Sequence, residues 1–319
     1  MSTTTTITTT TTPAPVRPEA AVPAAAPPAR LAERLHRDGY VLVRDVLPPE
    51  RFAAARAAAH RCMPAAADLP PPEPGAKALR TAFFPYTETD LNLLAVDQVF
   101  LDLAQVVLGT ADLRVGDSVL QGKYGTRFGS SRNQRLHHDA FEGASLVAAR
   151  PRGEHQRLFV IYYFTDVTDE TLAPTYVVPR RDQPDVPLLT EDGHASYDPE
   201  RYPALYKAER AVLAPANSAL VTLGNTIHRG SAMKAESAYR IALFVNFHSG
   251  RATWQRQPMW VGIPADPRSE SARQFMAAAS PRQRSALGVP PPGDVYWDAE
   301  TRALFARMYP GLDLRPYEA

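Results

Sequence analysis

The pattern of hydrophobic and polar positions divides the chain into a helical first third and a strand-rich remainder. In the first 110 residues, apolar side chains recur at helical spacing in three segments, which predict helices at about 31–38, 49–61 and 97–109. Proline begins the second of these helices, and an aspartate and a glycine flank the third, as is typical of helix ends. A strand is expected at 40–43, between the first two helices.

From residue 113 onward the pattern changes to short apolar runs separated by Gly, Pro, Asp and Asn. These runs predict strands at 113–123, 156–165, 175–179, 209–213, 218–223 and 239–248. Many strands after a few helices predict a mainly β fold, a sandwich or jelly-roll barrel with the N-terminal helices packed on one side. The proline-punctuated stretch at about 265–319 predicts a helical extension.

Composition changes this picture mainly at the N-terminus. Residues 13–29 contain six Pro and seven Ala, and the residues before them are rich in Thr. Such a stretch offers too little bulky apolar surface to offset the entropy lost on ordering. We therefore expect a disordered tail at 1–29 and a single folded domain at 30–319.

Charge and cysteine content limit the partners and the compartment. Lys and Arg number 35 and Asp and Glu 34, so the net charge of +1 disfavours nucleic-acid and membrane partners. The longest apolar run, at 158–164, is far shorter than the ~18 residues of a membrane-spanning helix. Cys62 is the only cysteine, which excludes an intrachain disulfide and a cysteine metal cluster. Without a targeting pattern either, the sequence predicts a cytoplasmic protein.

The segment LHHDAF at 136–141 carries the first candidate chemistry. In extended chain, His137 and Asp139 face the same side, whereas His138 faces the other and is expected to be a core or supporting residue. A carboxylate in apolar surroundings needs a positive partner, which a divalent metal would provide. The same spacing recurs at His36 and Asp38, but there it lies at a helix end and is expected to be structural.

A third metal ligand and an anion-binding residue follow later in the chain. His228, in GNTIHRG, comes directly after the strand expected at 218–223. Two histidines and one carboxylate are typical of non-haem Fe(II) oxygenases, although zinc could use the same ligands. Arg240 opens the alternating strand YRIALFVNF, whose pleat places Arg240, Ala242 and Phe244 on one face. A guanidinium pointing into a barrel requires an anionic partner, preferably a bidentate one.

These residues resemble the signature of the Fe(II)/2-oxoglutarate oxygenases. The layout over about 31–250 resembles the phytanoyl-CoA dioxygenase family in particular. The motifs that carry this likeness are DGYV at 38–41, LQGKYG at 120–125, YYFTDVTDE at 162–170 and PTYVVP at 174–179. Family members commonly continue the last motif with Gly-Ser-His, whereas this chain has Arg180-Arg181-Asp182.

The resemblance implies a double-stranded β-helix, a jelly-roll or cupin-like barrel, that uses Fe(II), 2-oxoglutarate and dioxygen. The implied metal ligands are His137, Asp139 and His228. The far carboxylate of 2-oxoglutarate would pair with Arg240, and Lys123 and Thr175 are further candidate contacts of this cosubstrate. Because related halogenases lack the carboxylate, its presence as Asp139 favours hydroxylation or a related C–H oxidation over halogenation.

Two other functions remain open from the residues: a zinc-dependent cupin-like hydrolase or isomerase, and a non-catalytic jelly-roll binding protein. For an oxygenase, analogy suggests a small-molecule substrate of secondary metabolism. The loops at 64–90, 125–135 and 180–207 and the C-terminal helices are expected to shape its pocket. Trp254 and Trp260 are expected to pack rather than to line it. The sequence does not indicate an oligomeric state.

Several arginines surround the metal motif. They are Arg127, Arg132, Arg135, Arg150, Arg152 and Arg157. They could face an anionic substrate, but a solvated surface is the expectation for this group.

Overall fold

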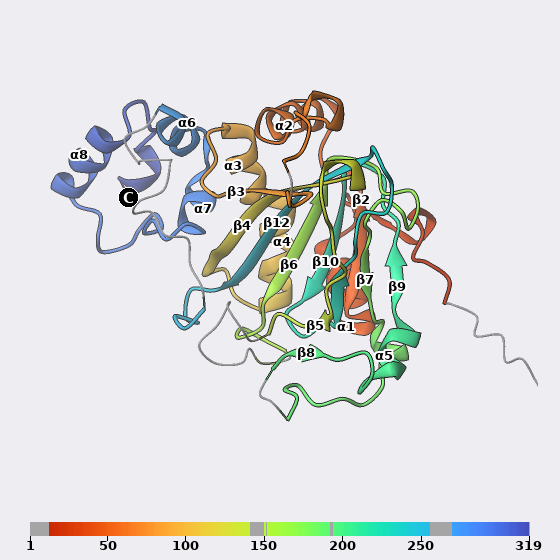
Figure 1. The fold of residues 1–319 in the computed structure, drawn as a ribbon. Helices are drawn as coiled ribbons and strands as arrows, with labels where there is room; N and C mark the ends of the chain where they lie inside the picture. Colours follow the sequence, from red (N-terminus) through yellow and green to blue (C-terminus); the bar gives the residue numbers. More distant parts are fainter. Residues whose placement is uncertain are drawn as a thin grey trace, which may run out of the picture.

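A computed structural model describes residues 13–73, 75–140, 150, 152–191, 194–255 and 270–318. These residues form two β-sheets (Figure 1). The large sheet has seven strands in the order β1 (Val22–Pro23), β2 (Tyr40–Arg44), β10 (Ser218–Leu223), β6 (Leu158–Tyr163), β12 (Tyr239–Ser249), β4 (Leu113–Tyr124) and β3 (Leu79–Phe83). The small sheet has five strands in the order β8 (Ser196–Tyr197), β5 (Leu136–His137), β11 (His228–Gly230), β7 (Thr175–Val177) and β9 (Arg210–Val212).

The two sheets face each other across an apolar interior. Ile161, Tyr163 and Ala242 of the large sheet belong to one buried cluster with Val177 and Val212 of the small sheet. On every central strand of the large sheet, alternate residues point inward to this space and outward to the helices. This arrangement confirms the jelly-roll barrel expected from the strand pattern.

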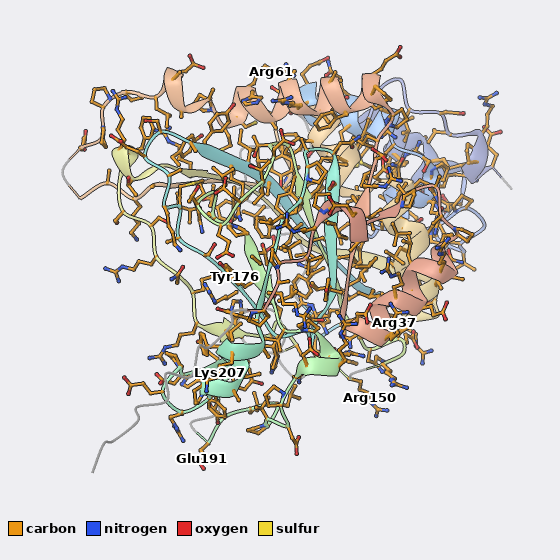
Figure 2. All side chains as sticks on the ribbon, turned by 90° about the vertical axis from the view of Figure 1, so that its right-hand side faces the viewer. Arg37, Arg61, Arg150, Tyr176, Glu191 and Lys207 are labelled. Carbon is orange, nitrogen blue, oxygen red and sulfur yellow. The ribbon has the colours of Figure 1, made fainter. Side chains whose placement is uncertain are left out.

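Helices cover the outer face of the large sheet. The described residues form the helices α1 (Pro28–Asp38), α2 (Pro49–Cys62), α3 (Thr89–Ala95), α4 (Gln98–Leu108), α5 (Pro203–Ala208), α6 (Glu270–Ala278), α7 (Pro281–Ser285) and α8 (Ala299–Met308), with 3₁₀ turns at Pro18–Ala20, Ala66–Asp68, Thr126–Phe128, Arg180–Asp182 and Arg315–Tyr317. Helices α1 to α4 contribute to the core on the outer face of the large sheet, whereas α5 packs with residues of the small sheet. In the main core, Leu35 of α1 and Phe100 of α4 pack with Val160 and Leu243 of the sheet. The outside of the molecule carries charged side chains such as Arg61 and Glu191 (Figure 2).

The expected ends of α4 are found as the sequence predicts. The Asp97 carboxylate accepts a hydrogen bond from the Val99 amide at 3.0 Å, and Gly109 adopts the left-handed conformation with φ 68°. The segment 64–90, expected to be a loop, instead contains β3 and is followed by α3. β3 lies at the sheet edge and is largely exposed, so it lacks the alternation that identifies a strand.

The expectation of a disordered tail is wrong for residues 13–29, while residues 1–12 lie outside the described part. Val22 pairs with Val43 at the edge of the large sheet, and Val16 forms a bridge with Val212. Val22 and Val16 are buried, with exposed fractions of 3% and 8%, respectively. Prolines are tolerated at a sheet edge because no inward N–H is needed there. Two buried valines and edge pairing therefore order a segment whose composition suggests disorder.

The segment Thr89–Leu108, which comprises α3 and α4, is long and apolar enough to cross a membrane by length and composition alone. In this fold, 67% of its apolar window is buried inside the molecule. The apolar side chains of α3 and α4 are thus explained by their packing in the main core of the protein.

The C-terminal helices pack together beside the barrel (Figure 1). Phe275 of α6 joins the main core and meets Phe84 edge to face at 6.0 Å. Met276, Phe305 and Tyr317 form a separate small core under α8. The helical extension expected at the C-terminus is thus present from residue 270 onward.

Candidate metal centre

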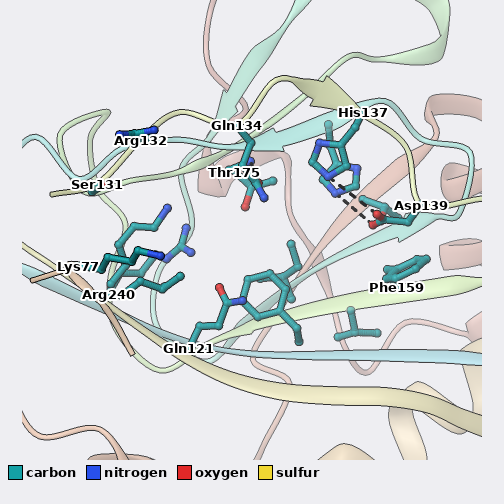
Figure 3. A pocket seen from close by; sticks show the side chains of 18 of the residues that line it. Lys77, Gln121, Ser131, Arg132, Gln134, His137, Asp139, Phe159, Thr175 and Arg240 are labelled. Atoms are coloured by element: carbon teal, nitrogen blue, oxygen red, sulfur yellow. Dashed lines mark hydrogen bonds and ion pairs between the residues drawn. The ribbon is translucent and has the colours of Figure 1, made fainter. Parts of the chain in front are cut away.

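Three side chains converge at one end of the barrel interior, although they are far apart in sequence. His137 of β5 and His228 of β11 are direct cross-strand partners, and their ring centroids lie 4.6 Å apart. Asp139 follows β5, with its carboxylate oxygens 3.9 Å from His137 Nε2 and 3.4 Å from His228 Nε2 (Figure 3). One ligand atom from each residue lies within 4.8 Å of the others. The i, i+2 spacing therefore brings His137 and Asp139 together, even though the strand itself ends at His137.

The imidazoles are oriented for metal binding by the backbone. His137 Nδ1 lies 2.8 Å from the Arg135 carbonyl, and His228 Nδ1 lies 3.0 Å from the Thr226 carbonyl. Each Nδ1 therefore carries the hydrogen that it donates, so the lone pair of each Nε2 faces the carboxylate. Burial lowers the pKa of His228, which favours the neutral imidazole that a metal requires. Two neutral nitrogens and one carboxylate fit a divalent transition metal.

His138 faces away from this cluster, as the alternation predicts. It is buried, and its Nδ1 accepts a hydrogen bond from the Ala140 amide at 3.3 Å. Its Nε2 lies 2.6 Å from the Leu188 carbonyl. With both ring nitrogens engaged by backbone, His138 is a structural residue.

Arg157 supports the aspartate from behind, which corrects the expectation of a solvated side chain. It is 0% exposed, and its Nη1 donates to the Asp139 carbonyl at 3.2 Å. Its Nη2 donates to Asn246 Oδ1 at 3.0 Å, and its guanidinium lies 4.8 Å from the Phe159 ring centroid. Of the other arginines around the motif, Arg132 lines the cavity described below. The remaining four are exposed, in agreement with the expectation: Arg127, Arg135, Arg150 and Arg152.

A cavity of about 750 Å³ extends from the histidines and Asp139 to Arg240. Arg240 is 2% exposed and donates from Nη1 to the Ala173 carbonyl. Its Nε is buried and has no hydrogen-bond partner among the described residues. Lys123 is the cross-strand neighbour of Arg240, and its Nζ donates to the Ser231 carbonyl at 2.7 Å. An unpartnered guanidinium N–H beside an ammonium fits a carboxylate ligand.

Burial lowers the pKa of both cations, and among the described residues that line the cavity the only acid, Asp139, lies at the other end (Figure 3). Burial lowers the pKa of Lys123 to about 7, helped by the positive charge of Arg240. It also lowers the pKa of Arg240. Thr175 of β7 lines the same cavity and accepts a hydrogen bond from the Tyr163 hydroxyl at 3.3 Å. The structure therefore brings all three residues expected to contact the cosubstrate to one cavity.

Arg180, which replaces the Gly-Ser-His of related sequences, has a structural place. Its Nη1 donates to the His36 carbonyl at 3.0 Å, and its Nη2 donates to Asn225 Oδ1 at 2.9 Å. Thr226, which follows Asn225 in the chain, donates a hydrogen bond from its hydroxyl to the Gly39 carbonyl at 2.5 Å. Arg180 thus joins the end of α1 to the loop that precedes His228.

The cavity walls differ in part from the expectation. The segments 64–90 and 125–135 contribute lining residues as expected, namely Lys77, Leu79, Ser130, Ser131, Arg132 and Gln134. No described residue of 180–207 or of the C-terminal helices does so. Trp254 packs at 5.2 Å on the ring of His155, and Trp260 lies outside the described residues.

Sequence reasoning missed several lining residues on the inner face of the large sheet. They include Gln121, Phe159, Ile161 and Thr222. Strand alternation places Phe244 on the face of Arg240, as the sequence predicts, and the same alternation from Lys123 could have identified Gln121. The others needed the strand order, because β6 joins the site through its pairing with β12, and β10 joins it through its pairing with β6.

A jelly-roll barrel with two histidines, a carboxylate and a buried arginine inside it points to the non-haem iron, 2-oxoglutarate-dependent oxygenases. The model of the family phytanoyl-CoA dioxygenase (PhyH) matches residues 35–242, more than half of the chain. The chain belongs to this family. It is therefore a 2-oxoglutarate-dependent dioxygenase that uses iron, 2-oxoglutarate and dioxygen. No curated protein matches the chain in sequence.

Solved structures with the same fold support this assignment at the level of architecture. One is the epimerase SnoN in complex with Fe3+, alpha ketoglutarate and nogalamycin RO, at 20% identity and a TM-score of 0.55 over 72% of this chain and 86% of that chain. A second is apo EctD from S. alaskensis, at 20% identity and a TM-score of 0.56 over 76% of this chain and 86% of that chain. A third is HygX from Streptomyces hygroscopicus with nickel, 2-oxoglutarate and hygromycin B bound, at 13% identity and a TM-score of 0.52 over 72% of this chain and 90% of that chain.

Proposed function

We propose that the protein oxidises an unactivated C–H bond of a small molecule, by hydroxylation or a related oxidation, and that its iron is held by His137, Asp139 and His228. The convergence of these three side chains carries the proposal. Two neutral histidines and one carboxylate leave positions open on the metal for other ligands. A zinc hydrolase would use the same three residues but has no need of the buried Arg240 beside them.

In this proposal, Arg240 binds the far carboxylate of 2-oxoglutarate. Its buried Nε offers a free N–H, and Lys123 adds a second positive charge on the neighbouring strand. Thr175 provides a hydroxyl on the opposite wall, from the small sheet. A dicarboxylate anchored in this way has its other end directed toward the histidines.

When bound, the iron and 2-oxoglutarate supply, together with dioxygen, the oxidising power for removal of hydrogen from a C–H bond. The protein's own residues provide position and shielding. The Arg135 and Thr226 carbonyls fix the imidazoles, and Arg157 fixes the backbone of Asp139. The apolar side chains of Phe159 and Ile161 exclude water from the floor of the site.

A small-molecule substrate of secondary metabolism is part of this proposal. The SnoN structure contains nogalamycin RO, and SnoN and the carbocyclase SnoK belong to nogalamycin biosynthesis. HygX was solved with hygromycin B, and EctD with 5-hydroxyectoine. A cavity of about 750 Å³ has room for such a molecule beside the cosubstrate. A cytoplasmic location, expected from the sequence, stays a prediction.

The proposal is tested by adding Fe(II) and then 2-oxoglutarate to the protein under anaerobic conditions. Wild type is expected to develop the metal-to-ligand charge-transfer band of the chelated cosubstrate. His137→Gln should lose both iron binding and the band, whereas the adjacent control His138→Gln should retain both, because His138 faces the backbone of Leu188. Absence of the band in wild type, or its persistence in His137→Gln, would refute the metal site.

Oxygen uptake over a panel of small molecules then tests turnover. Uptake that depends on 2-oxoglutarate and releases succinate is the expected result. A protein that binds iron and 2-oxoglutarate but yields no succinate with any compound would favour the non-catalytic binding alternative.

A further inference from the structure

The charges that line the cavity are strongly unbalanced. Among the described lining residues, Lys77, Lys123, Arg132 and Arg240 are cations, and Asp139 is the sole acid. In Figure 3, Lys77, Arg132 and Arg240 lie at the end of the cavity opposite Asp139. The cavity therefore has a metal-binding end and a cationic end.

The cosubstrate accounts for only part of this positive charge. If the proposed function is correct, the charges of a divalent metal, Asp139, the dicarboxylate and Arg240 cancel. Lys123 lies next to Arg240 and shares its carboxylate. Lys77 and Arg132 remain, and neither side chain forms an ion pair or a hydrogen bond with any residue that the structure describes. Two unpaired cations at the mouth of a cavity attract an anion and repel a cation.

The backbone that carries these two cations is fixed rather than loose. The Ala78 amide donates to the Ser130 carbonyl at 3.0 Å, and the Ser130 amide donates to the Ala76 carbonyl at 3.1 Å. Gly129 permits this contact, because a Cβ there would lie 2.3 Å from the Ala76 oxygen. Lys77 and Arg132 are thus held on one hydrogen-bonded corner.

The same corner is hydrogen-bonded to the end of β11, the strand that carries His228, and to the residues that follow this strand. Ser131 Oγ accepts from the Met233 amide at 2.8 Å, and Asn133 Oδ1 accepts from the Ala232 amide at 2.8 Å. Gln134 Oε1 accepts from the Gly230 amide at 2.7 Å. The distance from the cationic end to the metal-binding end is therefore set by the fold, which is what selection of a ligand by length and charge requires.

Between the two ends, apolar side chains line the cavity floor beside the polar Gln121 (Figure 3). Leu79 is 43% exposed and lies in register with Lys123 on the inner face of the large sheet. Phe244 also lines the cavity, and Phe159 lies beside Asp139 at the metal-binding end (Figure 3). We infer that the substrate is an organic anion, with a carboxylate or phosphate group bound by Lys77 and Arg132 and an apolar body that extends over Leu79 and Phe244 toward the metal.

Calorimetry on the Ni(II) protein saturated with 2-oxoglutarate tests this inference. The probes are octanoate, octyl phosphate, octanamide and octylamine, which share one chain length. Both anions are expected to bind at least about tenfold more tightly than octanamide, with octylamine weakest. The order of octanoate and octyl phosphate identifies the preferred anionic group. Anions that bind no tighter than octanamide, or no binding of either anion, would overturn the inference.

Variants separate the proposed pair from general charge effects. Lys77→Ala/Arg132→Ala should lose about tenfold in octanoate affinity and keep its affinity for 2-oxoglutarate. The control Arg56→Ala/Lys207→Ala removes two exposed cations outside the cavity and should change neither; Lys207 lies at the periphery in Figure 2. An equal loss in the control, or no loss in the first pair, would contradict the inference.

Charge reversal provides a positive test that loss of folding cannot mimic. Lys77→Glu/Arg132→Glu should bind octylamine more tightly than octanoate, and an unchanged preference for the anion would contradict the inference. The failure of this inference is distinguishable from that of the proposed function. If 2-oxoglutarate does not bind the metal-loaded protein, the proposed function fails. If it binds but the probes are not discriminated by charge, only the anionic substrate is wrong.

Discussion

Replacing Arg240 with methionine is expected to change the stability of the ligand-free protein and its affinity for 2-oxoglutarate in opposite directions. Arg240 is 2% exposed, yet it donates to one carbonyl and faces no carboxylate among the described residues. Burial and the neighbouring charge of Lys123 make this guanidinium unfavourable until an anion binds. Methionine fills a similar volume and removes the charge.

The magnitude follows from these contacts. Removing a buried cation without an ionic partner gains several kcal/mol of desolvation energy, while leaving the Ala173 carbonyl without its donor costs about 1–3 kcal/mol. We expect the free energy of unfolding of the apoprotein to rise by roughly 1–3 kcal/mol, or a Tm increase of about 2 °C or more. Loss of a buried charge-assisted contact to the ligand costs about 2–4 kcal/mol, which raises the Kd for 2-oxoglutarate roughly 30- to 1,000-fold.

Thermal unfolding of the metal-free protein measures the first effect, and calorimetric titration of the Ni(II) protein with 2-oxoglutarate measures the second. Arg284→Met is a matched control, because Arg284 is also buried but donates to the Met276 and Ala279 carbonyls and to the Tyr317 hydroxyl. The control should lower the Tm and leave 2-oxoglutarate affinity unchanged. If Arg240→Met behaved like this control, Arg240 would be a structural arginine and the cosubstrate site would be wrong.

Three further predictions concern the metal and its neighbours. Asp139→Ala should abolish iron binding and turnover, since Asp139 is the sole anionic ligand; full iron content and retained succinate release would refute its role. Arg157→Met should weaken iron about 10- to 100-fold in a chelator competition, because the Asp139 backbone loses its donor; unchanged iron affinity would remove Arg157 from the site. Above pH 7, Lys123 is neutral in the ligand-free protein and must take up a proton to pair with a carboxylate, so 2-oxoglutarate affinity should fall by up to about tenfold per pH unit. Lys123→Met should abolish this dependence, and a pH-independent wild type would contradict it.

The local part of the site could be predicted from the sequence because it depends on strand geometry. The two-residue spacing brings His137 and Asp139 to one side, and the pleat turns Arg240 inward. The meeting of His228 with His137 depends instead on the pairing of β11 with β5. No local pattern specifies that pairing, so the sequence could present His228 only as a candidate third ligand after the strand at 218–223, a choice that the family resemblance supports.

Other features escaped prediction because they depend on distant contacts. The stretch around Arg157 is charged, a composition typical of an exposed segment. The guanidinium of Arg157 is nevertheless buried, through contacts with Asp139 and with Asn246, which lies 89 positions away. Val16 and Val22 lie in a segment whose composition indicates disorder, but Val16 is ordered by a bridge to the distant Val212 and Val22 by pairing with Val43 of β2. In each case one long-range partner outweighs the local composition.

The charge distribution of the cavity also explains why stability and function oppose each other here. The ligand-free fold holds buried or converging cations, and burial lowers the pKa of both Lys123 and Arg240. These groups make the empty cavity less stable than an apolar one would be, and each anion that binds relieves part of that cost. Because 2-oxoglutarate binds the folded protein, its binding stabilises the fold, and the free energy of unfolding therefore rises with the concentration of 2-oxoglutarate. Lys77 and Arg132 are exposed and therefore cost the empty fold little, but they have no ionic partner among the described residues and are available to pair with a second anion beside the cosubstrate.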